Sequence, residues 1–138
     1  MSQYWLLKSE PFVYSFDQLV KDKKTGWSGV RNFQARNFLK QARKGDLALI
    51  YHSNEGKAVV GIAKVVAEAY ADVDPETPGE WVQIDVAPVE KLKHPVTLAE
   101  MKKNAKLKDI LLFKQSRLSV LPVSKLHFDL ITKLGSGS

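Results

Sequence analysis

The stretch YWLLKSEP, residues 4–11, begins as an apolar strand and ends on lysine, serine and glutamate side chains. Alternate residues of a strand point to opposite faces of a sheet, so Trp5 and Leu7 share one face. Pro11 has no backbone N–H to donate to a neighbouring strand and therefore ends this one. We expect a strand over residues 3–8 whose polar end is either a solvated strand end or the rim of a binding site.

Short helices and further strands follow along the chain. Ser15 precedes Gln18, and Thr97 precedes Glu100, with the spacing of a capping box, which marks the start of a helix. The predicted helices span residues 15–23, 33–43, 98–104 and 125–134, and the predicted strands span residues 47–53, 58–70, 81–92 and 117–123. Because strands and helices do not alternate regularly, we expect an α+β fold, a barrel-like arrangement of about five or six strands with short helices around it.

Local breaks in these patterns indicate where the backbone changes direction. Gly61, inside a long predicted strand, indicates a β-bulge or a close backbone approach. Pro88 indicates a bend or an edge in the strand predicted over residues 81–92. The acidic stretch at residues 71–80, with two prolines, is predicted to be a solvated loop, and residues 107–113 are apolar but ambiguous.

The length of 138 residues suits one domain, which we place at residues 1–134, with GSGS at 135–138 as a flexible tail. The chain has no cysteine, which excludes disulfides and thiolate metal sites and suits a reducing compartment. No apolar run approaches the roughly 18 residues of a membrane span, and no Lys/Arg-led apolar segment opens the chain. We expect a cytoplasmic protein with no membrane contact, or a nuclear one if the source is eukaryotic.

Lysine and arginine number 21 against 15 aspartates and glutamates, which gives a net charge of +6. This excess is compatible with a polyanion partner such as nucleic acid, although solvated lysines would give the same balance. The basic side chains of the helix at residues 33–43 could alternatively bind an acidic protein. The composition therefore leaves both kinds of partner open.

Several kinds of chemistry have no motif in this chain. The three histidines, His52, His94 and His127, do not stand at a metal-ligand spacing. The sequence contains no phosphate-binding glycine loop and no GxSxG nucleophile turn. We therefore expect no metal site and no cofactor.

The polar stretch TGWSGVRN, residues 25–32, is predicted to be a loop and has the composition of a ligand site. Trp27 stands between two glycines, where it either plugs one end of the core or offers its face to a ligand. Arg31 presents a planar fork of donors that suits a phosphate. Asn32 carries a donor and an acceptor in one plane, which can read the edge of a base, and it also stands where a helix N-cap belongs.

Three predicted strand ends have the same mixed character. The segments are Lys8-Ser9-Glu10, Tyr51-His52-Ser53 and Arg117-Leu118-Ser119. If they share one rim with Trp27, they form a pocket for a flat polar ligand such as a nucleobase.

An ordered set of longer motifs carries a family resemblance. The set comprises YWLLKSEP, YSF-QL, W-GVRN--ARN-L, GD-ALIYHSN, VVGIAKVV-EAY-D, PVTL-E-K and RLSVLPV. In this order it strongly resembles the EVE domain of the PUA-like superfamily, the family of the thymocyte nuclear protein homologues, from residue 4 to about residue 132. One departure is Ala71, where the family usually has proline, and we expect it to affect a loop rather than the pocket.

The resemblance implies a PUA-like pseudo-barrel with one deep pocket that reads a modified base in DNA or RNA, with modified cytosine favoured. EVE domains are similar to YTH domains, which hold a methylated base in an aromatic cage, and to ASCH and PUA domains, which bind RNA. Lys8, Ser9 and Trp27 match the YTH-like pattern. The second cage tryptophan would fall near Val86 and has no counterpart, so a full methyladenine cage is not expected.

On this interpretation Ser9 and Asn32 hydrogen-bond the edge of a flipped base, Trp27 stacks on its face, and Tyr51 closes the pocket. The predicted base-binding residues are Ser9, Trp27, Val30, Asn32, Tyr51, Ser53, Leu118 and Ser119, and the predicted phosphate or rim contacts are Lys8, Arg31, Arg36, His52 and Arg117. The expected partner is DNA or RNA that carries a modified base, and no catalytic residue is assigned.

An enzyme is the alternative hypothesis. In an amidohydrolase of the ASCH kind, acting on a modified nucleobase or nucleoside, Lys8 would activate a hydroxyl and Glu10 would shuttle a proton. Consecutive strand residues alternate faces, so Lys8 and Ser9 reach one pocket only if the strand breaks near Pro11. The choice between DNA and RNA, the modification and the oligomeric state are left open.

Overall fold

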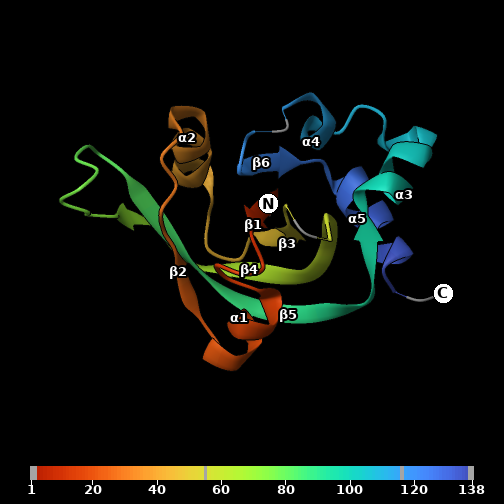
Figure 1. The fold of residues 1–138 in the computed structure, drawn as a ribbon, viewed down its shortest axis with the longest axis horizontal. Coiled ribbons are helices and arrows are strands. Elements are labelled where there is room, and N and C mark those ends of the chain that lie inside the picture. Colours follow the sequence, from red (N-terminus) through yellow and green to blue (C-terminus); the bar gives the residue numbers. More distant parts are fainter. Residues whose placement is uncertain (1–2, 55, 116, 137–138) are drawn as a thin grey trace.

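The computed structural model describes residues 3–54, 56–115 and 117–136, and in these ranges six strands form one mixed sheet with helices around it (Figure 1). The strands are β1 (Tyr4–Ser9), β2 (Thr25–Trp27), β3 (Leu47–His52), β4 (Ala58–Ala71), β5 (Val82–Thr97) and β6 (Val120–Val123). The helices are α1 (Phe16–Asp22), α2 (Phe33–Gln41), α3 (Leu98–Lys103), the 3-10 helix η1 (Ala105–Leu107), α4 (Leu111–Lys114) and α5 (Lys125–Leu134). The predicted α+β class is confirmed.

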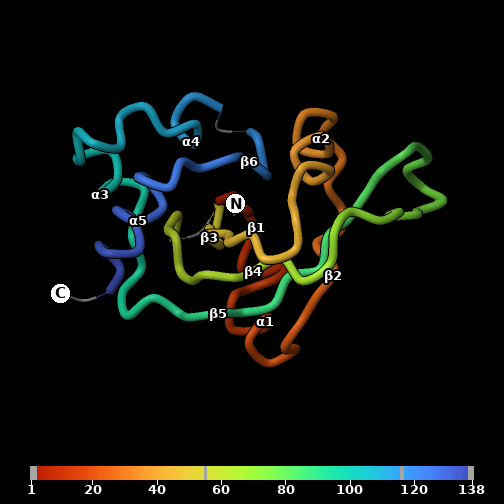
Figure 2. The backbone as a smooth tube through the Cα atoms, turned by 180° about the vertical axis from the view of Figure 1, so that it is seen from behind, coloured from red at the N-terminus to blue at the C-terminus, as the bar shows by residue number. Residues whose placement is uncertain are grey.

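The sheet has the order β2-β5-β4-β3-β1-β6, in which β1 and β3 are parallel and every other pair is antiparallel. Trp5, Leu6 and Leu7 in β1 are almost completely buried, so both faces of this inner strand are covered. The views agree that α1 and α2 lie on opposite sides of β4 and β5, whereas α3 and α5 lie toward the C-terminus and α4 lies beside β6 (Figures 1 and 2). The core therefore lies on both sides of β1.

The two longest strands curve, and their pairing explains the curvature. The register between β4 and β5 shifts at several points, and one shift lies where Pro88 stands opposite Ala63. Such bulges bend a strand and increase its twist. Within the described residues β2 and β6 each pair with one strand only, so the sheet curls without closing, as in the pseudo-barrel predicted from the sequence.

Gly61 lies in β4 where α1 packs on the sheet. A Cβ atom at this position would lie 2.5 Å from Cε1 and Cζ of Phe16, closer than real Cβ contacts allow. The pairing of β4 with β5 also shifts between Val59 and Gly61. The predicted bulge is therefore present, whereas the close neighbour of Gly61 is the Phe16 side chain rather than another backbone.

The structure corrects three of the predicted element boundaries. Residues 25–27, predicted as loop, form β2, because their backbone pairs with residues 84–86 near the start of β5, far away in the sequence. The strand predicted over 81–92 continues to Thr97, because it keeps pairing with the start of β4. The last strand begins at Val120 rather than at residue 117, and the ambiguous apolar stretch contributes to two short helical segments.

Hydrogen bonds tie the described residues after α5 back to that helix. The amide of Gly135 donates to the carbonyl of Ile131, and the Ser136 hydroxyl donates to the carbonyl of Lys133. The other residues of the predicted tail, 137–138, lie outside the described residues, so the domain boundary stays a prediction. In the part of the chain that the structure describes, no helix is long and apolar enough to cross a membrane.

Candidate functional site

The three polar segments singled out in the sequence meet at one end of the sheet. The ends of β1 and β3 lie side by side because the two strands are parallel, and the Ser53 amide donates to the Ser9 carbonyl at 3.0 Å. The Lys8 amide donates to the Ser119 carbonyl, just before β6, at 2.9 Å. One backbone network therefore holds all three segments around the end of β1.

Three adjoining cavities open around this point in the described part of the chain. The first encloses about 400 Å³ between the end of β1 and β2, and Trp27 lines it. The second encloses about 390 Å³ beside β3, and Lys8 and Ser9 line both the first and the second. The third encloses about 290 Å³ at the start of α2 and shares Arg117 with the second. The polar end of β1 is therefore the rim between two hollows.

Trp27 is part of the core and also lines the first cavity. Its side chain is 7% exposed. The Tyr14 ring meets it edge to face, with the ring centroids 6.2 Å apart and an interplanar angle of 88°. Tyr14 lines the same cavity but was not predicted as a site residue. Val86, where a second cage residue was sought, is fully buried and pairs with Thr25.

Ser9 lines the first cavity, and its hydroxyl is hydrogen-bonded to the backbone. Its hydroxyl donates to the Tyr14 carbonyl at 2.6 Å, with the Glu10 carbonyl as a longer alternative at 3.4 Å, and either bond engages its only proton. The lone pairs of the oxygen remain able to accept a hydrogen bond. A ligand that donates an N–H therefore suits this position better than one that offers a carbonyl.

Lys8 and Tyr51 form the boundary of the second cavity. The Lys8 ammonium lies 5.9 Å from the centroid of the Tyr51 ring, within the range of a cation–π contact. Burial lowers the pKa of Lys8 and raises the pKa of Tyr51. Ser53 and Ser119 line this cavity as well, so its lining combines hydroxyl groups with one aromatic ring.

The third cavity is lined by Asn32, whose side-chain amide was predicted to read the edge of a base. The Asn32 Oδ1 atom accepts from the Ala35 amide at 2.9 Å, so Asn32 is the N-cap of α2. Asn32 lines this cavity with Leu118 and Arg117, whereas Ser9 and Trp27 line the first. The structure thus distributes the predicted pocket over three neighbouring hollows.

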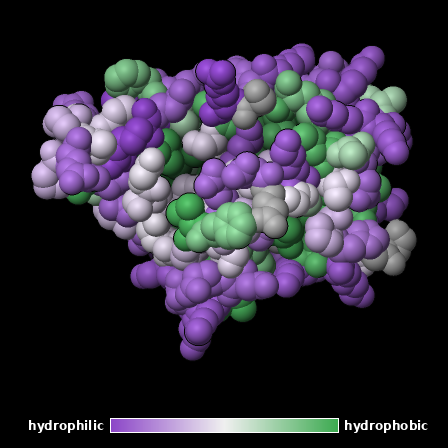
Figure 3. Space-filling model, viewed as in Figure 1, coloured by the Kyte–Doolittle hydropathy of each residue, from purple (hydrophilic) through white to green (hydrophobic). Residues whose placement is uncertain are grey.

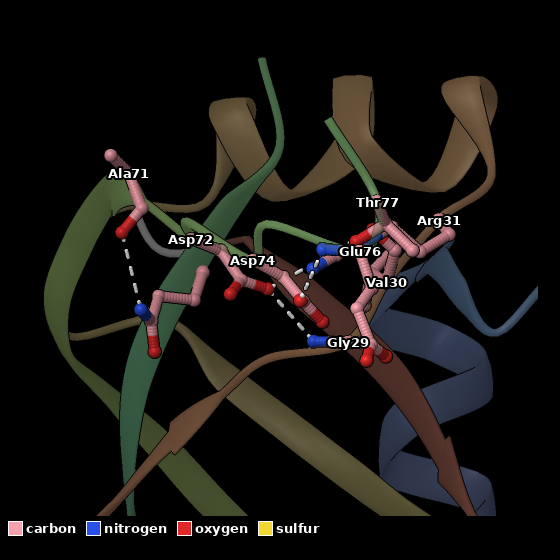
Figure 4. Close-up of polar contacts among 9 residues, drawn as sticks. Gly29, Val30, Arg31, Ala71, Asp72, Asp74, Glu76 and Thr77 are labelled. Carbon is pink, nitrogen blue, oxygen red and sulfur yellow. Dashed lines mark hydrogen bonds and ion pairs between the residues drawn. The ribbon is translucent and has the colours of Figure 1, made fainter. Parts of the chain in front are cut away.

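Arg31 lies outside these cavities and is held by the β4–β5 loop (Figure 4). Its Nη1 atom lies 2.9 Å from Oδ2 of Asp72, and its Nε donates to the Thr77 hydroxyl at 2.9 Å. The Gly29 amide donates to the same carboxylate oxygen at 2.8 Å. The hydrogen bond from Arg31 is the main cause that lowers the pKa of Asp72. Asp72 is thus a buried exception in a loop predicted to be solvated. Arg31 ties that loop to the segment before α2, and its guanidinium lies 5.4 Å from the centroid of the Trp81 ring.

Arg36 and Val30, two further predicted site residues, lie outside the three cavities. The Arg36 guanidinium lies 4.9 Å from the centroid of the Phe33 ring and 5.5 Å from that of Trp81. The two rings stack with centroids 5.3 Å apart. Val30 is 7% exposed and belongs to the core. These contacts give both residues a packing role at the start of α2.

His52, predicted as a rim contact, is tied to the start of α1. The Phe16 amide donates to the His52 Nε2 atom at 3.1 Å, which requires a neutral imidazole with Nε2 as the acceptor. Burial is the main cause that lowers the pKa of His52 below its ordinary value of 6.5, with Asp17 raising it and Lys91 lowering it.

The native state is expected to lose stability as the pH falls below about 6.5, because the unfolded chain then binds a proton that folded His52 resists. Replacement His52→Gln keeps an acceptor for the Phe16 amide and removes this titration. The melting temperatures of both proteins, measured between about pH 7.5 and about pH 5.5, test this. Parallel curves for wild type and variant would show that His52 does not cause the loss.

Basic side chains dominate the three cavities. Lys8, Lys57, Lys114 and Arg117 line them, against the single carboxylate of Glu10 among the described lining residues. Among the described residues, no group of three or more His, Asp or Glu side chains could hold a metal ion. The arrangement suits an anionic ligand that presents a flat polar group to the aromatic wall.

Comparison with known proteins identifies the family of this fold. The family model described as EVE domain matches residues 3–134. Thymocyte nuclear protein 1 from Homo sapiens is 35% identical, and the match covers 97% of this chain and 74% of that protein. The crystal structure of human THYN1 protein in complex with 5-methylcytosine containing DNA superposes with a TM-score of 0.88 and 33% identity, covering 97% of this chain and 98% of that one.

A more distant structure shares the fold. The YTH domain of Zygosaccharomyces rouxii MRB1 protein, solved in complex with N6-methyladenosine RNA, superposes with a TM-score of 0.60 and 17% identity. The match covers 98% of this chain and 85% of that chain. At this identity the likeness concerns the fold alone. It agrees with the PUA-like, YTH-related architecture predicted from the sequence.

Proposed function

The chain belongs to the EVE domain family, and from that premise we propose that it is a non-catalytic domain that binds nucleic acid and reads a modified base. Modified cytosine is the target we favour. The observation that carries the proposal is the first cavity, where Trp27 and Tyr14 supply an aromatic wall and Ser9 a hydrogen-bond acceptor. The complex of the similar human protein with 5-methylcytosine containing DNA supports it.

The energetics require several contacts to act together. Extraction of a base from a stack costs a few kcal/mol, and stacking on an aromatic side chain returns about 1–3 kcal/mol. Stacking on Trp27 alone therefore does not reliably offset the cost. Hydrogen bonds to the base edge supply the remainder, and a cavity of about 400 Å³ has the size of ordinary small-ligand sites.

The hydrogen bond that Ser9 already donates favours a base with an exocyclic amino group as its ligand. Because the hydroxyl donates to the Tyr14 carbonyl, it accepts from the amino group of cytosine better than it accommodates the carbonyl of thymine. Asn32 and Tyr51 stand in the neighbouring cavities and contact the flanking nucleotides in this proposal. Lys8 and Arg117 contact phosphates.

Titration of labelled single strands tests the proposal. DNA and RNA oligonucleotides with one central cytosine, methylcytosine, hydroxymethylcytosine or methyladenine are compared by fluorescence anisotropy. We expect a preference for a modified cytosine, and Ser9→Ala is expected to weaken that binding by about fivefold to tenfold, the effect of one lost hydrogen bond. Equal affinity for every strand in the wild-type protein would contradict the proposal.

Arg117 is expected to contribute one phosphate contact. Replacement Arg117→Gln should reduce the slope of log K against log salt concentration by about 0.7 on single strands or about 0.9 on duplex DNA. Arg43→Gln is the matched control, because Arg43 lines none of the three cavities and pairs with Glu68. Equal slopes for wild type and Arg117→Gln would place the phosphates elsewhere.

An amidohydrolase is the second candidate, and one observation favours it. Lys8, Ser9 and Glu10 all line both the first and the second cavity, so one ligand there would lie near all three side chains, although β1 keeps its pairing with β3 as far as Ser9. Burial also lowers the pKa of Lys8, as a catalytic lysine requires. Release of acetate from acetylcytidine would support this function, whereas binding without turnover supports the reader.

A further inference from the structure

Two large apolar side chains stand exposed beside the first cavity. Phe12 is 78% exposed and Val13 is 75% exposed, both on the segment that joins β1 to α1. Val13 also lines the first cavity, so this segment forms its lip. Figure 3 shows an apolar patch among hydrophilic side chains near the centre of the face on which Figure 1 places the end of β1. Neither residue belongs to the hydrophobic core.

The segment is held in this shape by its backbone. The amides of Val13 and Tyr14 both donate to the Glu10 carbonyl at 2.9 Å. The Ser9 hydroxyl donates a hydrogen bond to the Tyr14 carbonyl at 2.6 Å. The ring of Pro11 restricts the backbone φ angle at that residue. Phe12 is therefore displayed on a tight hydrogen-bonded turn, so little ordering is needed when it meets a partner.

Cations line the cavities next to the turn, and Glu10 within the turn is the one carboxylate among their described lining residues. Lys8 lines the same cavity, and the adjoining cavities add Lys57, Lys114 and Arg117. An apolar tip at the lip of cation-lined cavities matches a base stack between two phosphate backbones, because apolar wedges enter base steps while cations contact phosphates. An apolar protein surface would not need these flanking charges.

From these observations, and resting on the proposed function, we infer that Phe12 and Val13 form a wedge that enters duplex nucleic acid beside the extracted base. Phe12 takes the place of the lost base in the stack, while the base enters the first cavity against Trp27. The wedge thereby offsets part of the unstacking cost that a duplex imposes. A single strand has no pair to open, so it gains little from the wedge.

Paired titrations of one methylcytosine sequence, as a single strand and as a duplex, test the inference. Phe12→Ala is expected to weaken duplex binding by about tenfold while single-strand binding changes by less than about twofold. Phe12→Leu should keep duplex binding within about threefold of wild type, because leucine also serves as a wedge. Leu126→Ala on α5, where Leu126 is 70% exposed, controls for the loss of an exposed apolar side chain.

The outcomes distinguish a failure of the wedge from a failure of the proposed function. If wild type prefers methylcytosine in both forms but Phe12→Ala affects neither form, or both equally, the wedge is overturned and the reader stands. If wild type shows no preference in either form, the proposed function itself fails and the wedge fails with it. A loss confined to the duplex, absent in Leu126→Ala, supports the wedge.

Discussion

Replacement of Trp27 by alanine is expected to remove the preference for a modified base and to weaken binding by about 5- to 150-fold, the equivalent of about 1–3 kcal/mol of stacking. The same change is expected to lower the free energy of unfolding by about 3–5 kcal/mol, because the indole is also part of the core. Binding by anisotropy and unfolding in urea measure the two effects separately, at a temperature where the variant is folded.

Two further variants keep this prediction testable. Trp27→Phe retains an aromatic face and most of the packing, so it should recover part of both losses. Trp81→Ala removes an indole that lines none of the three cavities, and its binding should match wild type. If folded Trp27→Ala bound as tightly as wild type, Trp27 would serve the core alone and the base would bind elsewhere.

Asp46→Ala is expected to lower the free energy of unfolding by about 3–5 kcal/mol without any direct effect on the cavities. The carboxylate is 2% exposed and accepts from the Trp5 indole Nε1 at 2.9 Å, the Arg43 amide at 2.8 Å and the Gln3 amide at 2.9 Å. Its removal leaves these donors without their partner, and a buried unpaired donor costs about 1–3 kcal/mol. Urea denaturation measures the loss.

The matched control for Asp46 is Asp129→Ala. Asp129 pairs with Lys125 one helical turn away on the exposed surface of α5, and such pairs contribute less than about 1 kcal/mol. Asp46→Asn keeps one acceptor oxygen and should fall between the two. A loss at Asp46→Ala no larger than that at Asp129→Ala would show that the Trp5 and amide donors find water in its place.

The sequence predicted most elements because their limits are encoded locally. Ser15, Asn32, Thr97 and Ser124 each accept a backbone N–H bond at the start of a helix, as their positions imply. β2 was missed because three residues carry no readable alternation, and its strand character comes from pairing with β5. Long-range pairing of this kind leaves no local pattern in a sequence.

The candidate site was also predicted only in part from the sequence. The polar ends of the strands identified the rim, because a polar side chain at the end of an apolar strand is conspicuous. Tyr14 was missed because its role depends on the turn that brings it against Trp27. Arg31 was expected to contact phosphate on its chemistry alone, and its partner Asp72 is 41 residues away in the sequence. Residue types suggest chemistry, whereas the partners depend on the fold.

The most direct measurement is an NMR spectrum of the protein bound to a short strand with one methylcytosine. The account predicts nuclear Overhauser effects between the base and the ring protons of Trp27 and Tyr14, with shift changes at the amides of Ser9 and Gly26, which line the first cavity. Contacts of the base confined to Asn32 and Arg117 in the third cavity would contradict it. So would a spectrum in which only exposed lysine and arginine side chains respond.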